Sequence, residues 1–276
     1  MKNLTSLLPV FRLSVVLGTF LFLVAGSKAQ NLDVAYVPTP GFVVERMLDM
    51  ADVGPGDYVI DLGCGDGRIV IAAAKRGAFG HGVDLDPQRI KEARKNAKRA
   101  GVADSVVFEV GNIYETDFSR ASVIAMYLFP SINLKLRPML LENLEPGSRI
   151  VSHDFGMDDW KPDEQHGNLE VHAVYLWIVP ARVEGNWSCR ISGKEYKMQI
   201  NQEFQNIEIN LDSENEVFKI DDSLLSGKRI SFTANEIASN KRLVFSAQVE
   251  DGKIEGVVQI HDGNNKTVEN WIARIE

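Results

Sequence analysis

The stretch Asp61-Leu62-Gly63-Cys64-Gly65-Asp66-Gly67-Arg68 decides the fold of this chain. The apolar run before it, Tyr58 to Ile60, predicts a buried strand, and the run after it, Ile69 to Lys75, predicts the first turns of a helix. Glycines in such a turn permit positive φ angles and let a ligand approach the main chain closely. The helix N-terminus presents free N–H groups and the positive end of the helix dipole. A strand, a glycine-rich turn and a helix in this order therefore indicate a ligand site.

The spacing of the glycines and two nearby acids narrow the choice of ligand. A dinucleotide site has the pattern G-x-G-x-x-G, whereas here the third glycine, Gly67, comes one residue early. Asp61 ends the first strand, where its carboxylate could accept a hydrogen bond from a ligand ammonium. Asp84 ends the next expected strand, the position from which a carboxylate binds both hydroxyls of an adenosine ribose. The combination fits S-adenosylmethionine better than NAD.

The same residues resemble a known family. Asp61 to Arg68 resembles motif I of the class I S-adenosylmethionine-dependent methyltransferases. With Tyr36-Val-Pro-Thr-Pro40, Leu128-Phe-Pro-Ser131 and Leu144-Glu-Pro-Gly-Ser-Arg-Ile-Val-Ser152, the pattern is similar to the protein-lysine methyltransferases that include the mitochondrial enzymes acting on the adenine nucleotide translocase and the ATP synthase c-subunit. The resemblance covers residues 36–179. One departure is Asp84, where those relatives tend to carry Glu.

The resemblance implies a set of cofactor contacts. The turn residues Gly63, Cys64 and Gly65 would lie against S-adenosylmethionine. The polar residue after the third strand, Asn112, would meet the adenine amino group, with Ile113 as an apolar wall for the ring. From the sequence alone, Asn112 is equally consistent with an ordinary turn asparagine.

Tyr36 and Thr39, two further candidates for cofactor contact, lie in the proline-containing segment before the first expected helix. Pro38 and Pro40 keep the residues before them away from helical geometry. The segment is either a plain linker or, as the resemblance implies, a lid in which Tyr36 and Thr39 cover the cofactor.

Catalytic candidates follow the fourth and fifth expected strands. Tyr127 ends the fourth strand, and ligands bind at the carboxyl ends of parallel strands, so we expect it near the transferred methyl group; the alternative is a core aromatic. Asp154 follows the fifth strand after His153 and is a candidate substrate contact. The alternative is that His153 and Asp154 form a loop pair with no catalytic role.

The pattern predicts an α/β fold: a doubly wound, Rossmann-like sheet, then a small all-β sandwich or barrel. Within the first part we expect helices over 42–50, 87–100 and 132–143, and a final antiparallel strand, Val171 to Val179, that finishes the sheet. The boundaries expected are a methyltransferase domain over residues 30–182 and a β-rich domain over 183–276.

The C-terminal part carries short runs of alternating polarity separated by Ser-Gly and Asp-Gly turns. The runs are Glu195–Ile200, Asn206–Leu211, Arg229–Thr233, Leu243–Val249, Ile254–Ile260 and Val268–Ile275. Trp187 and Trp271 are expected to cap the core of this domain. It contains no recognisable catalytic constellation.

Composition limits the partners. The net charge is −8 and is spread evenly along the chain, whereas nucleic-acid-binding proteins carry a basic field. The basic helix over 87–100 is interpreted as a solvated face rather than a docking surface. The two cysteines, Cys64 and Cys189, allow neither a disulfide framework nor a zinc spacing, so no metal is expected.

Residues 1–29 read as a signal peptide or an N-terminal anchor. Lys2 and Arg12 precede a short apolar run, and Ser27-Lys28-Ala29 is a small-x-small cleavage site. We therefore expect export to the periplasm or outside the cell, or anchoring to the membrane. This expectation conflicts with a cofactor that is made in the cytosol.

Three functions remain open on these grounds. The first is an S-adenosylmethionine-dependent methyltransferase that N-methylates a protein lysine by in-line transfer. The second is a small-molecule or RNA methyltransferase on the same fold. The third is an exported binding protein that keeps the fold without activity.

Overall fold

The computed structural model describes residues 36–168, 172–214 and 216–276. The expected signal or anchor segment, residues 1–29, lies outside these ranges, as does Val171 at the start of the expected final strand. Within the described ranges, no helix combines the length and the apolar character needed to cross a membrane.

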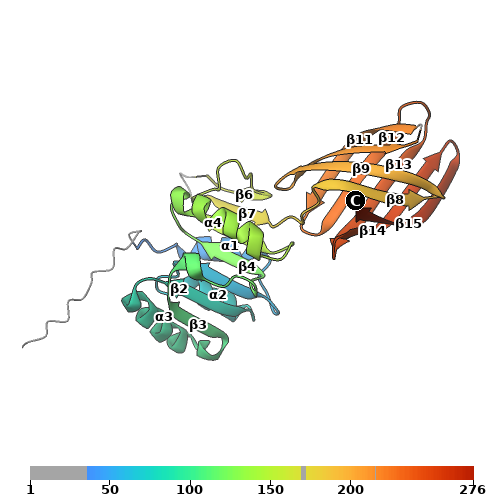
Figure 1. The fold of residues 1–276 in the computed structure, drawn as a ribbon. Helices are drawn as coiled ribbons and strands as arrows, with labels where there is room; N and C mark the ends of the chain where they lie inside the picture. The colour runs from blue at the N-terminus through green and yellow to red at the C-terminus, as the bar shows by residue number, and fades with distance from the viewer. Residues whose placement is uncertain (1–35, 169–171, 215) are drawn as a thin grey trace, which may run out of the picture. The chain divides into compact units, whose positions relative to one another are not determined.

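The first part of the chain forms a seven-stranded sheet in the order β3-β2-β1-β4-β5-β7-β6 (Figure 1). Strands β1 to β5 run parallel, and β7 runs antiparallel to β5. The strands are β1 (Tyr58–Leu62), β2 (Phe79–Asp84), β3 (Val106–Val110), β4 (Val123–Met126), β5 (Arg149–His153), β6 (Glu164–His166) and β7 (Val174–Ile178). The predicted doubly wound sheet and its antiparallel strand are confirmed.

β7 is the last strand of this sheet along the chain, as predicted, but the edge strand β6 was not predicted. β6 pairs antiparallel with β7 on its outer side. Its three residues, Glu164 to His166, are all exposed, so the strand has no apolar alternation that could reveal it in the sequence.

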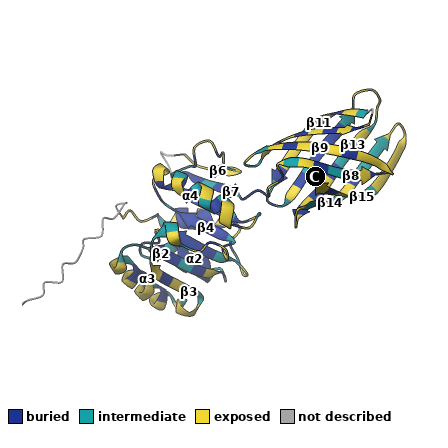
Figure 2. Cartoon of the chain, in the orientation of Figure 1, coloured by how far each residue is buried: buried dark blue, intermediate teal, exposed yellow. Residues whose placement is uncertain are grey.

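Helices cover both faces of the sheet. They are α1 (Gly41–Met50), α2 (Arg68–Lys75), α3 (Pro87–Ala100) and α4 (Pro130–Asn143), with 3-10 turns η1 (Ala103–Ser105) and η2 (Ile113–Glu115). Successive residues of a strand point to opposite faces. Accordingly Val59 shares a buried cluster with α1 and α2, whereas Ile60 shares one with Leu136 and Leu140 of α4. The central strands are buried along most of their length (Figure 2).

The strand order places a crevice at one edge of the sheet. β1 lies between β2 on one side and β4 on the other, so the connections after β1 and β4 leave toward opposite faces. Crevices at such reversals, at the carboxyl ends of the strands, are where open α/β sheets bind ligands.

The last part of the chain is a closed eight-stranded antiparallel barrel. Of the two architectures expected from the sequence, the barrel is therefore correct and the sandwich is not. Its strands are β8 (Gly185–Ile191), β9 (Lys194–Glu203), β10 (Asn206–Ser213), β11 (Glu216–Ser226), β12 (Arg229–Glu236), β13 (Arg242–Glu250), β14 (Lys253–Asp262) and β15 (Asn265–Ile275). The sequence pattern missed β8 and β11. In β11 the register shifts between Asp221 and Leu224, which breaks the alternation of buried and exposed residues.

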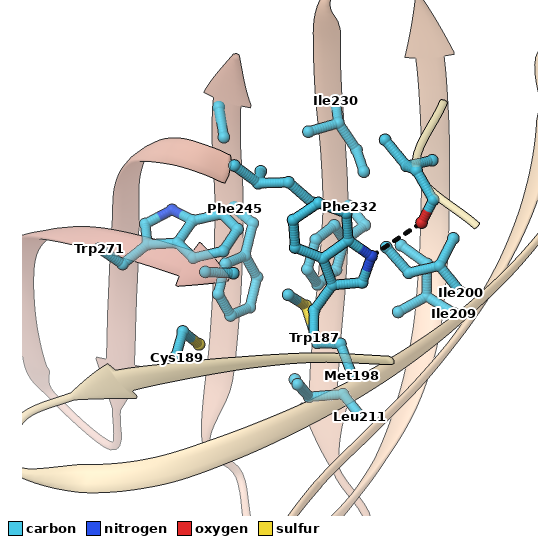
Figure 3. Close-up of a cluster of buried hydrophobic side chains, with 14 of the residues drawn as sticks. Trp187, Cys189, Met198, Ile200, Ile209, Leu211, Ile230, Phe232, Phe245 and Trp271 are labelled. Carbon is cyan, nitrogen blue, oxygen red and sulfur yellow. Dashed lines mark hydrogen bonds between the residues drawn. The ribbon is translucent and has the colours of Figure 1, made fainter. Parts of the chain in front are cut away.

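The barrel interior is filled by apolar side chains (Figure 3). Trp187 and Trp271, which were expected to cap this core, are each 2% exposed and belong to its buried cluster. The rings of Phe232 and Phe245 stack at 4.3 Å, and Trp271 meets Phe245 edge-on at 5.0 Å. The indole N–H of Trp187 donates to the carbonyl of Val183 at 2.8 Å. Eight strands enclose an interior just wide enough for side chains to fill in this way.

Candidate active site

A cavity of about 200 Å³ opens at the carboxyl ends of β1, β2 and β4. Its wall includes nine of the eleven residues proposed from the sequence: Tyr36, Thr39, Asp61, Gly63, Cys64, Asp84, Asn112, Ile113 and Tyr127. Gly65 and Asp154 do not line it, although both contact residues that do. The structure thus gathers into one cavity nine predicted residues that are up to 91 positions apart in the sequence.

The turn after β1 is held in a shape that requires glycine. Gly63, Gly65 and Gly67 all have positive φ, at 79°, 52° and 79°. A Cβ on Gly67 would lie 2.7 Å from the ring of Phe108, which is closer than any side chain could approach. The N–H groups of Gly63 and Cys64 both donate to the carbonyl of Val83, at 2.9 and 3.0 Å. These bonds fix the turn to the neighbouring strand and place the first turn of α2 at the cavity.

Asp61 lies at the floor of the cavity and is only 3% exposed. Burial, together with the nearby carboxylates of Asp84 and Asp66, raises its pKa from 3.8 to about 8. The same burial and the charge of Asp61 raise the pKa of the Cys64 thiol, so this cysteine stays protonated and is no nucleophile. A cationic group beside Asp61 would be stabilised by the field of these acids.

Asp84 is oriented by the backbone on both of its oxygens. Its Oδ2 accepts a hydrogen bond from the Gly65 N–H at 2.9 Å, and its Oδ1 accepts one from the Asp86 N–H at 2.9 Å. A carboxylate has about four acceptor sites. One site on each oxygen therefore remains for the two hydroxyls of a ribose.

The segment before α1 lies along the cavity. A Cβ on Gly65 would meet the Tyr36 ring at 2.3 Å, so the ring rests directly on the glycine turn. The Arg89 guanidinium stacks on the same ring at 4.1 Å from its centre. The Thr39 carbonyl accepts a hydrogen bond from Arg68 Nη1 at 2.8 Å. These contacts fit the lid interpretation better than a plain linker.

Asn112 has the local contacts of a turn residue and also lines the cavity. Its Oδ1 accepts from the Tyr114 N–H at 3.1 Å, and its Nδ2 donates to Glu115 Oε1 at 3.0 Å. Ile113 lines the cavity beside it. Both interpretations of Asn112 therefore describe part of its environment.

Tyr127 and the loop after β5 form the other end of the cavity. The Tyr127 hydroxyl donates to Asp154 Oδ2 at 3.4 Å, and its ring lies 4.0 Å from that of His153 and stacks with that of Phe155 at 5.9 Å. Burial and the charge of Asp154 raise the pKa of Tyr127. Burial lowers the pKa of His153 to about 4, so its imidazole is neutral near pH 7.

Sequence reasoning missed several residues of the cavity wall. Asp66 and Arg68 belong to the motif itself and form an ion pair of 2.7 Å. Phe129 and Phe155 follow β4 and β5 and line the cavity. Their positions just after parallel strands were the available signal, because that is where ligands bind in such sheets.

The donor set fits S-adenosylmethionine. This molecule carries an ammonium and a sulfonium against a single carboxylate, so it is a net cation. The cavity offers the carboxyl groups of Asp61 and Asp84, while Asp66 is neutralised by Arg68. Asp61 would hold the ammonium and Asp84 the ribose, with apolar side chains around the rest.

Residues 61–164 match the model of the ANTKMT methyltransferase domain. A protein-lysine N-methyltransferase of Saccharolobus islandicus is 44% identical over 152 residues, which cover 53% of this chain and 94% of that relative. The adenine nucleotide translocase lysine N-methyltransferase of Mus musculus is 35% identical over 133 residues, which cover 48% of this chain and 58% of the relative.

A solved structure covers 53% of this chain, as the relative from Saccharolobus islandicus does. It is that of an RNA methyltransferase from Salinibacter ruber in complex with S-adenosyl-L-homocysteine, 54% identical, with a TM-score of 0.52, over 53% of this chain and 96% of that one. The cofactor product in that structure agrees with the cofactor that the cavity fits. The chain belongs to the class I S-adenosylmethionine-dependent methyltransferases, in the family of the ANTKMT methyltransferase domain.

Proposed function

We propose that this chain N-methylates a lysine side chain of a protein. The similar proteins from Saccharolobus islandicus and Mus musculus are named lysine N-methyltransferases. The observation that carries the proposal is the cavity itself, because it has a carboxylate floor for the cofactor and an aromatic end. Tyr127, Phe129 and Phe155 form that end.

When bound, the cofactor supplies an electrophilic methyl group on a positively charged sulfur. The chain contributes alignment and exclusion of water, which are the main requirements of an in-line displacement. Asp61 would hold the ammonium of the cofactor and Asp84 its ribose, and the Tyr36 ring rests on the glycine turn. No covalent nucleophile from the chain is needed.

The acceptor amine must be neutral to attack. Transfer of a lysine ammonium into a poorly solvated site favours its neutral form. The rings of Tyr127 and Phe155 stack beside the cavity, and the Tyr127 hydroxyl lies against Asp154 Oδ2. This end of the cavity would therefore strip water from the amine and orient it.

The test is to incubate the purified chain with methyl-labelled S-adenosylmethionine and cell fractions. Label in a protease-sensitive, ribonuclease-resistant product, with methyl-lysine found by mass spectrometry, supports the proposal. Asp84→Ala, which removes the ribose carboxylate, serves as the inactive control. Loss of the label on ribonuclease treatment would instead show that the methyl acceptor is RNA.

An RNA methyltransferase is the second candidate, since the relative at 54% identity is named as one. The negative charge of the chain argues against an RNA substrate. The chain carries −8 overall, and the acids of the cavity add to the negative potential that a phosphate backbone would meet.

We further propose that the chain is exported or anchored by its N-terminal segment. Support comes from the positive residues, the apolar run and the Ser27-Lys28-Ala29 site. Cell fractionation of the full chain and of a form lacking residues 2–29 tests this: cytoplasmic recovery of both forms would refute export.

A further inference from the structure

Two histidines and a carboxylate converge beside the cavity. His153 ends β5, Asp154 follows it, and His172 lies just before β7. His153 Nε2 lies 3.1 Å from His172 Nδ1 and 3.3 Å from Asp154 Oδ2, and His172 Nδ1 lies 3.7 Å from Asp154 Oδ2. Among the described residues, this is the one group of three or more potential metal-ligating side chains whose donor atoms come this close together.

These separations match the spacing of ligands around a small cation. They leave a point about 2.0 Å from all three donor atoms, close to the Zn–N and Zn–O bond lengths of about 2.0–2.2 Å. The mean of the three donor–donor distances is nearer to the ligand–ligand distance of a tetrahedral site than to the shorter ligand–ligand distance of an octahedral site. Two imidazoles and one carboxylate are also a donor set that first-row divalent cations take, whereas Mg²⁺ and Ca²⁺ prefer oxygen ligands.

Two of the three side chains are also fixed by hydrogen bonds on the side away from the proposed cation. Asp154 Oδ1 accepts a hydrogen bond from the Ala173 N–H at 3.0 Å. Its Oδ2 faces the two imidazoles and also accepts a hydrogen bond from the Tyr127 hydroxyl at 3.4 Å. The other ring nitrogen of His153, Nδ1, lies 3.2 Å from Thr39 Oγ1. Metal-binding histidines and carboxylates are usually fixed by such outer contacts.

The backbone at two of the three proposed ligands has an uncommon conformation. Asp154 and His172 both have positive φ, at 59° and 65°, a conformation that non-glycine residues adopt at a cost. Such strain gathers at functional sites, where the surrounding structure holds it. Here it turns two side chains toward the buried His153, which is 0% exposed.

We propose that His153 Nε2, His172 Nδ1 and Asp154 Oδ2 bind one first-row divalent cation, with Zn²⁺ as the best fit. The His172 side chain is 41% exposed, so the fourth position of the cation is accessible to water. The bound cation would join the carboxyl end of β5 to the amino end of β7. Through His153 it would also support Thr39 and Tyr127, which line the cavity.

The test is a titration of the full chain, without a polyhistidine tag, with Co²⁺ as a spectroscopic substitute for Zn²⁺. We expect saturation at one cation per chain, the intense visible absorption of a four-coordinate site, and displacement by one equivalent of Zn²⁺. Thiolate charge-transfer bands should be absent, because Cys64 and Cys189 are both buried.

Two variants locate the site. His172→Ala removes a ligand from a partly exposed position and should weaken Zn²⁺ affinity by more than the roughly 10- to 100-fold that loss of an outer contact costs. His261→Ala, on barrel strand β14, is the matched control and should bind Zn²⁺ as the unaltered chain does. An unchanged far-UV circular dichroism spectrum and a cooperative thermal unfolding transition in His172→Ala show that the variant is folded.

Asp154→Asn provides a second route should His172→Ala fail to fold, and it should weaken Zn²⁺ binding as well. The absence of saturable Co²⁺ binding would overturn the proposal and leave a hydrogen-bonded cluster. Equal Zn²⁺ affinity in the unaltered chain and a folded ligand variant would overturn it too. The methyltransferase reaction is tested separately, by transfer of the labelled methyl group and by the Asp84→Ala variant, so failure of cation binding and failure of methyl transfer are distinguishable.

Discussion

The Oδ2 atom of Asp84 lies 2.9 Å from the backbone nitrogen of Gly65, so the carboxylate at the end of β2 is held by the turn after β1. The two strands are neighbours in the sheet, and their ends meet at the cavity. One hydrogen bond therefore couples the shape of the glycine turn to the direction of the acid that would bind the ribose.

Replacing Asp84 by Glu keeps the charge but moves the carboxylate outward by about 1.5 Å, one C–C bond. The bond to Gly65 should be lost, which lowers the free energy of unfolding by about 1 kcal/mol. We expect cofactor affinity to fall about tenfold, or about 1.4 kcal/mol, measured by calorimetry. Undiminished affinity would show that the Gly65 bond does not set the direction of the acid.

The raised pKa of Asp61 predicts proton release on cofactor binding. Since its pKa in the folded chain is about 8 and the usual value is 3.8, Asp61 is protonated in the free protein at pH 6.5. The unfolded chain would bind fewer protons there, so the stability of the free protein should fall as pH rises from about 4 to about 8.

A ligand ammonium beside Asp61 should expel that proton. At pH 6.5 the ligand ammonium, with an ordinary pKa near 8, is itself charged. Calorimetric titrations in phosphate and in Tris should therefore give different enthalpies, while Asp61→Asn should bind more weakly and show no buffer dependence. Identical enthalpies in the two buffers would contradict the pairing.

Gly65→Ala tests the contact between the turn and Tyr36. The added Cβ would lie 2.3 Å from the Tyr36 ring and must displace it, so we expect a loss of cofactor affinity of about tenfold. Gly101→Ala is the matched control, because Gly101 also has positive φ, at 73°, but nothing lies within 4 Å of its Cβ position. Both variants should lose about 1 kcal/mol of stability from backbone strain, and only Gly65→Ala should lose affinity.

Tyr127→Phe removes the hydroxyl that contacts Asp154 and keeps the ring that packs on His153. We expect kcat to fall about tenfold, which corresponds to about 1.4 kcal/mol in the barrier, with cofactor affinity unchanged. Tyr58→Phe, at the start of β1, is the control and should leave kcat unaltered. An unaffected rate in Tyr127→Phe would remove this hydroxyl from the reaction.

Much of the sheet could be predicted because local chemistry and global fold agree there. The motif from Asp61 to Arg68 requires a strand before it and a helix after it, and the parallel order then brings Asp84 and Tyr127 to the same edge. β6 could not be predicted, because three exposed polar residues carry no periodicity. β11 was missed because its register shift interrupts the alternation.

Nine of the predicted site residues line the cavity, whereas contacts between side chains distant in the sequence gave no signal. Asp61 and Asp84 follow directly from the chemistry of the cofactor. His172 could not be linked to His153 from the sequence, because only the pairing of β5 with β7 brings them together. The contact of Thr39 with His153 spans 114 positions and has no local signal.

The central claim is that the cavity at the ends of β1 and β2 binds S-adenosylmethionine through Asp61 and Asp84. Its most direct test is a calorimetric titration of the purified chain with the cofactor, run beside Asp84→Ala. We expect saturable binding of one cofactor per chain, and binding about a hundredfold weaker, or about 2.8 kcal/mol, in the variant. Equal binding by both proteins, or no binding by the unaltered chain, would contradict it.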